Sequence, residues 1–180
     1  MKKEVLLVLS LLIIISASAQ ETTQPNSQEV TEIPEFEAGI LPDNPLYVVD
    51  KAIDDFKINI ASDENKAEVA LEVHNERVAE AQELAENGNH DYLSEAISEA
   101  DKTITIVQEE ITPEFSDNIK YSTKRSLEVL TKLKEDVPEK ALEGIETAIN
   151  KQIVTEKKTE IVAEITSKID GLCTQLIELV

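Results

Sequence analysis

The side chains most able to do chemistry lie in residues 66–81. His74 comes three residues after Leu71 and four before Val78, so helical spacing places its ring on an apolar face. Neutral imidazole is a common metal ligand, which makes His74 a candidate ligand together with carboxylates from another helix. The spacing favours a half-buried structural histidine instead.

The same segment contains a candidate ion pair. Arg77 and Glu80 are three residues apart, a spacing at which oppositely charged side chains on a helix meet. We therefore predict a structural ion pair between Arg77 and Glu80 that fixes the helix register.

No other pattern indicates a reaction or a cofactor. The chain has one cysteine, two histidines and four isolated glycines, and it lacks His-x-x-x-His, Glu-x-x-His and Gly-x-Ser-x-Gly. Zinc and di-iron sites, nucleophilic triads and phosphate-binding loops need those patterns. We expect no catalytic residues, no cofactor-binding residues and no dedicated metal site, and we interpret the protein as non-enzymatic.

The net charge bears on the class of partner. It is −20 at pH 7, from 37 acidic and 17 basic residues. A surplus of this size repels nucleic acid and anionic lipid. We expect protein partners and no nucleic acid.

The N-terminus predicts export. Lys2 and Lys3 precede an apolar run at residues 5–15, and Ala-Ser-Ala follows at residues 17–19. This is the order of a secretory signal peptide, and the apolar run is shorter than the roughly 20 residues that span a bilayer. We predict a signal peptide at 1–19 and a secreted, extracytoplasmic protein at the cell envelope, without membrane insertion after cleavage. An uncleaved anchor is the alternative.

The elements that would position these residues are helices. Residues 20–38 have the composition of a flexible acidic linker, and residues 39–180 form the predicted helical domain. Asn44 and Pro45 suit a helix start, and the helix that follows should bury one apolar face. This predicted buried face consists of Leu46, Val49, Ile53, Phe56 and Ile60.

Further apolar patterns with helical spacing continue to the C-terminus. They predict helices that end near Gly88, near Thr112-Pro113 and near Pro138. After Pro138, either one helix of about 40 residues or two helices fit, and a bend near residues 155–158 is favoured because the stripe turns polar there. The last apolar positions are Ile161, Ile165, Ile169, Leu172, Leu176 and Leu179.

The fold class is therefore all-α, an antiparallel bundle of five to six amphipathic helices. Apolar helix faces of this kind could also form coiled coils between subunits, so a homo-oligomer is possible. Cys173 either pairs with another chain or is a small apolar residue on its helix, and the second alternative is favoured.

Two motifs resemble a known family. One is Leu-Pro-Asp-Asn-Pro-Leu-Tyr at residues 41–47, and the other combines Lys-Ala-Glu at 66–68 with Asn-Glu-Arg-Val-Ala-Glu-Ala at 75–81. Together they resemble domain-of-unknown-function family 5667 over residues 39–151, which leaves 152–180 as a C-terminal helix. The resemblance implies a helical domain of exported or membrane-attached proteins in archaea and actinobacteria, with no activity to transfer.

These observations predict an interaction or scaffold module at the cell envelope. The alternative is an extracytoplasmic cation-binding or buffering protein that uses His74 and the carboxylate-rich helix faces.

Overall fold

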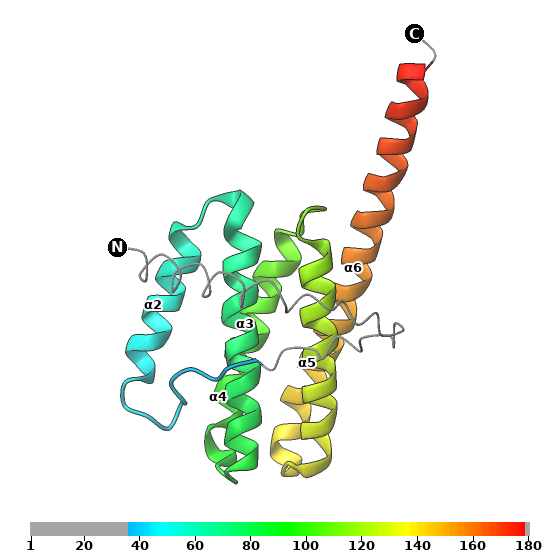
Figure 1. Cartoon of the computed structure of the whole chain (residues 1–180). Helices are drawn as coiled ribbons and strands as arrows, with labels where there is room; N and C mark the ends of the chain where they lie inside the picture. Colours follow the sequence, from blue (N-terminus) through cyan, green and yellow to red (C-terminus); the bar gives the residue numbers. More distant parts are fainter. Residues whose placement is uncertain (1–35, 179–180) are drawn as a thin grey trace, which may run out of the picture. The chain divides into compact units, whose positions relative to one another are not determined.

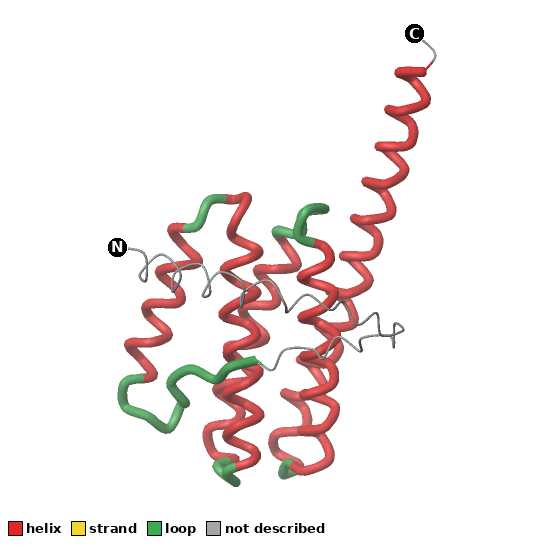
Figure 2. Tube along the Cα trace, viewed as in Figure 1, coloured by secondary structure: helices red, strands yellow, loops and turns green. Residues whose placement is uncertain are grey.

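Five α-helices follow one another in the computed structural model, which describes residues 36–178. They are α2 at Tyr47–Ile60, α3 at Asp63–Glu86, α4 at His90–Glu109, α5 at Ser116–Asp136 and α6 at Glu139–Glu178. Figure 2 shows helices joined by short loops, with no strand among the described residues. The predicted all-α class is confirmed. The predicted signal peptide at 1–19 and most of the 20–38 linker lie outside the described residues.

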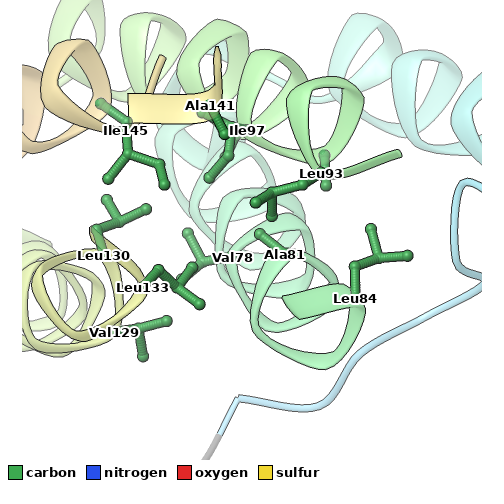
Figure 3. Packing of buried hydrophobic residues seen from close by; sticks show 13 residues of the cluster. Val78, Ala81, Leu84, Leu93, Ile97, Val129, Leu130, Leu133, Ala141 and Ile145 are labelled. Atoms are coloured by element: carbon green, nitrogen blue, oxygen red, sulfur yellow. The ribbon is translucent and has the colours of Figure 1, made fainter. Parts of the chain in front are cut away.

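Helices α3 to α6 form a four-helix bundle, in which α3 packs on α4 and α5, and α6 packs on α4 and α5. Figure 1 shows α2 beside this bundle, and α3 is its helix neighbour. The larger core cluster lies where α3, α4, α5 and α6 meet (Figure 3). Its fully buried members include Val78, Leu84, Leu93, Leu130 and Ile145.

The turn between α3 and α4 requires a glycine at position 88. Gly88 has a φ of 70°, a left-handed conformation that glycine adopts without steric cost. Its N–H donates to the carbonyl of Ala85, and the N–H of Asn89 donates to the carbonyl of Leu84. These two bonds form a Schellman cap, so the chain reverses direction directly after α3.

Helix α6 is a single helix of 40 residues, about 60 Å long at 1.5 Å per residue. Residues 155–158 lie within it, so the two-helix alternative is wrong. Thr155 and Thr159 are buried there, which shows that the polar part of the pattern still faces the bundle. Beyond Thr159 no described residue of α6 is buried, and this part extends past the other helices (Figure 1).

The predicted burial of α2 is wrong. Its five predicted core side chains are between 50% and 65% exposed. The buried residues of α2 are Tyr47, Asp54 and Ile58, on the face that contacts α3. The reason is that α2 docks through a polar cluster around an arginine of α3, which turns its apolar face outward.

Candidate functional site

The polar cluster between α2 and α3 centres on Arg77, which we call the Arg77 cluster. Its side chain is 1% exposed and its guanidinium group donates to three carboxylates. One is Asp50, with 3.0 Å between Arg77 Nη2 and Asp50 Oδ2. The others are Asp54 on α2 and Glu80 one turn along α3. The structure thus brings the predicted pair Arg77 and Glu80 together and adds two aspartates from α2.

Tyr47 completes the packing around this arginine. The guanidinium carbon of Arg77 is 5.2 Å from the centroid of the Tyr47 ring, within the range of a cation–π contact. The ring is buried, and its hydroxyl has no hydrogen-bond partner among the described residues. Burial and the charge of Glu80 raise the pKa of Tyr47, so the phenol stays protonated at neutral pH.

Glu76 adds a fourth carboxylate at the edge of the Arg77 cluster. One oxygen from each of Asp50, Glu76 and Glu80 lies within 4.8 Å of the others. The second oxygen of Glu80 is buried without a hydrogen-bond partner. Gly39 leaves room for Glu76, because a Cβ atom built there would be 1.7 Å from Glu76 Oε1.

The charges of the Arg77 cluster do not balance. Arg77 pairs with Asp50, Asp54 and Glu80, and Glu76 adds a further carboxylate beside Asp50 and Glu80. The exposed Lys57 compensates Asp54 at 2.7 Å. Burial raises the pKa of Glu80 and of Glu76, and Arg77 opposes both shifts. The cluster therefore favours taking up a proton or binding a cation through its carboxylate oxygens.

His74 lies elsewhere, within the four-helix bundle. Nδ1 is 2.9 Å from the carbonyl oxygen of Ala100 on α4, so Nδ1 bears the proton and donates it. Nε2 then accepts from the amide of Gln152 on α6 at 2.9 Å and faces the Ser126 hydroxyl on α5 at 3.1 Å. We call these residues the His74 cluster.

These contacts give His74 a structural role. Both ring nitrogens are engaged in hydrogen bonds. Within residues 36–178, the set of carboxylates that could hold a cation does not include His74. Complete burial lowers the pKa of His74 to about 4, so the ring is neutral at physiological pH. A neutral ring with a fixed tautomer aligns four helices.

Sequence reasoning missed the partners of both clusters. Tyr47, Asp50 and Asp54 are spaced by three and four residues and so share one side of α2, next to the apolar face. That second face was the available signal, but the apolar one was the more obvious candidate for burial. Ser126 and Gln152 gave no such signal, because they belong to helices far apart in the chain.

Exposed apolar side chains form a third feature. On α2 and at its N-cap they are Leu46, Val48, Val49, Ile53, Phe56 and Ile60, and all of these except Val48 form what we call the α2 stripe. On the last part of α6 the exposed apolar side chains are Ile161, Ile165, Ile169, Leu172, Leu176 and Ile177. Four of them continue the heptad spacing of the half-buried Val162, and we call these five the α6 stripe: Val162, Ile165, Ile169, Leu172 and Leu176. No helix within residues 36–178 combines the length and the apolar composition that a bilayer crossing requires.

Comparison with curated proteins and with solved structures gives no match. A family model described as "Domain of unknown function" matches residues 39–140, which cover α2 to α5 and the start of α6. Gln152 and the α6 stripe lie beyond the match, although Gln152 completes the His74 cluster. The match covers more than half of the chain, and the protein therefore belongs to the DUF5667 family.

Proposed function

We propose that this protein is a non-enzymatic interaction or scaffold module, secreted to the cell envelope. The observation that carries the proposal is the pair of exposed apolar stripes on α2 and α6. Monomeric soluble proteins rarely expose contiguous apolar surface of this extent, and such patches mark interaction sites. Each stripe also follows the three-and-four spacing with which helices pair.

Two further features support an interaction role. The Arg77 cluster joins α2 to α3, and the His74 cluster joins α3 to α4 and α6, so both clusters serve to pack helices together. Helix α6 extends past the bundle (Figure 1), and the exposed side chains of the α6 stripe lie on this extension, where a partner has access. Extracytoplasmic location rests on the sequence pattern of residues 1–19.

The location is tested by fractionating cells that express the C-terminally tagged chain. We expect the protein outside the cytoplasm, with an N-terminus at Gln20 by mass spectrometry. Deleting residues 2–19 should retain it in the cytoplasm. Wild-type protein found in the cytosol with Met1 still attached would contradict the proposed extracytoplasmic location.

The interaction role is tested by crosslinking in intact cells. A photoreactive residue at position 169, in the α6 stripe, should give discrete crosslinked protein bands. The same residue at position 167 replaces an exposed serine on the opposite face and should give few. Equal labelling from both positions would count against a stripe-mediated contact.

Cation binding is a second candidate function, and the Arg77 cluster favours it. Three carboxylates whose oxygens lie within 4.8 Å, with a buried unpartnered oxygen on Glu80, match the oxygen ligands that Ca²⁺ prefers. This moves the candidate site from His74 to Asp50, Glu76 and Glu80. Calorimetric titration with Ca²⁺ should give one site per chain, which Glu76→Gln weakens and Glu72→Gln, on the exposed face of α3, does not. Binding that is equal in both variants would remove this candidate.

A further inference from the structure

The α2 and α6 stripes have the same spacing. From Leu46 to Ile60, successive members are three, four, three and four residues apart, and the same intervals separate the members from Val162 to Leu176. This is the heptad pattern that lets two helices interlock along one line of contact. The side-chain spacing of each stripe is therefore compatible with packing against the other.

The two stripes cannot meet within one chain. Helix α2 packs on α3 and makes no contact with α6 within residues 36–178. Figure 1 shows α2 and the projecting part of α6 on opposite sides of the bundle. Because α6 is one continuous helix with its first half packed on α4 and α5, its second half cannot fold back over α2.

We propose that the α6 stripe of one copy packs on the α2 stripe of a second copy, and reciprocally, in a two-fold dimer. This inference rests on the proposed interaction function and names its partner as a second copy of this chain. Two-fold symmetry repeats the contact between the α6 stripe of one copy and the α2 stripe of the other. The dimer therefore contains two equivalent stripe-to-stripe contacts, which we call seams, and neither stripe stays exposed.

The area is adequate for a stable dimer. Ten side chains that are about half exposed would bury roughly 700 Å² in one seam and about 1,400 Å² in two. Specific stable interfaces bury about 1,200–2,000 Å². The area buried in a single seam falls below this range. The reciprocal dimer with two seams is therefore favoured over an open polymer in which neighbouring copies share one seam.

The charge distribution permits this contact. Two copies with a net charge of −20 each repel one another, so the flanks of a seam must be poor in acidic residues. The heptad positions beside the α6 stripe carry no acid and include one lysine. They are Ile161, Thr166, Lys168, Cys173 and Gln175, whereas Glu164, Asp170 and Glu178 lie away from it. On α2, the one flanking acid is Asp50, which pairs with Arg77.

The test is the oligomeric state of the chain without residues 1–19, which retains every described residue. Sedimentation equilibrium should give a dimer at physiological salt. Ile53→Glu and Ile169→Glu each place a charge in both seams, and each should weaken the dimer by at least about 100-fold. Matched controls are Val48→Glu and Ile177→Glu, because these residues are 73% and 76% exposed outside the stripes, and both should remain dimeric.

Mixing the two stripe variants is the decisive measurement. A mixed pair keeps one intact seam, between the α6 stripe of the Ile53→Glu chain and the α2 stripe of the Ile169→Glu chain. The equimolar mixture should therefore associate more tightly than either variant alone. Pairing of α6 with α6 predicts instead that Ile53→Glu stays dimeric and that mixing restores nothing, and this result would overturn the proposal.

The proposal and the proposed function can fail separately. A monomeric wild-type chain, with circular dichroism that shows folded helices, overturns the dimer. If position 169 then still crosslinks to a different protein in cells, the interaction function stands with another partner. If the chain is monomeric and no stripe position crosslinks, both fail.

Discussion

The amide of Gln152 donates a hydrogen bond to Nε2 of His74, 2.9 Å away and 78 residues earlier in the chain. This contact ties α6 to α3 in the centre of the bundle, where both side chains are buried. Because the family match ends at residue 140, the bundle of this protein depends on a helix that lies mostly outside the matched region. The folded unit is therefore larger than the matched segment.

Replacing Arg77 with methionine should strongly destabilise the protein. The substitution leaves buried Glu80 without its cation and leaves Asp54 with Lys57 alone, and breaking a buried ion pair in this way costs about 3–5 kcal/mol of unfolding free energy. Urea denaturation measures this loss. The control Lys134→Met removes an exposed pair with Glu146 and should change stability by less than about 0.5 kcal/mol.

Removing the hydroxyl of Tyr47 should cost little or nothing. The hydroxyl is buried and has no hydrogen-bond partner among the described residues, so Tyr47→Phe deletes an unsatisfied polar group and keeps the ring against Arg77. We expect a change between neutral and about 1 kcal/mol more stable. Tyr47→Ala, which removes the ring as well, should cost about 3–5 kcal/mol. If Tyr47→Phe were as damaging as Tyr47→Ala, the hydroxyl would have an essential partner.

The pKa of His74 predicts how stability depends on pH. The folded protein holds this pKa at about 4, below the value of about 6.5 expected in the unfolded chain. Between these values only the unfolded chain binds the proton. The contribution of His74 is therefore present above pH 6.5 and is lost as the pH falls toward 4, by roughly 3 kcal/mol in total.

Urea denaturation between pH 4 and 7.5 checks this dependence. His74→Gln should be less stable at neutral pH but should lose less stability on acidification than the wild type. Equal slopes for wild type and His74→Gln would assign the acid sensitivity to the carboxylates alone.

The sequence predicts the local order of this fold better than its assembly. The stripe of Leu46, Ile53 and Phe56 correctly predicts an amphipathic helix, but periodicity indicates only that a face is apolar and not what covers it. The opposite face of α2 carries Asp54, whose attraction to buried Arg77 decides which side docks. Contacts within one helix, such as Arg77 with Glu80, follow from spacing. Contacts such as His74 with Gln152 depend on how whole helices are placed, which spacing does not encode.

Removing the second half of α6 should leave the bundle folded. Burial on α6 ends at Thr159, so a stop codon after Glu160 deletes the α6 stripe but no described buried side chain. At concentrations where chains are dissociated, we expect the free energy of unfolding to stay within about 0.5 kcal/mol of the full-length value. By contrast, Ile145→Ala in the first half of α6 removes a fully buried core side chain and should cost about 2–5 kcal/mol. Urea denaturation of the truncated chain and of Ile145→Ala, followed by circular dichroism, measures both. A truncated chain as unstable as Ile145→Ala would mean that the projecting part of α6 stabilises the bundle itself, and the α6 stripe would then not be a surface free to bind a partner.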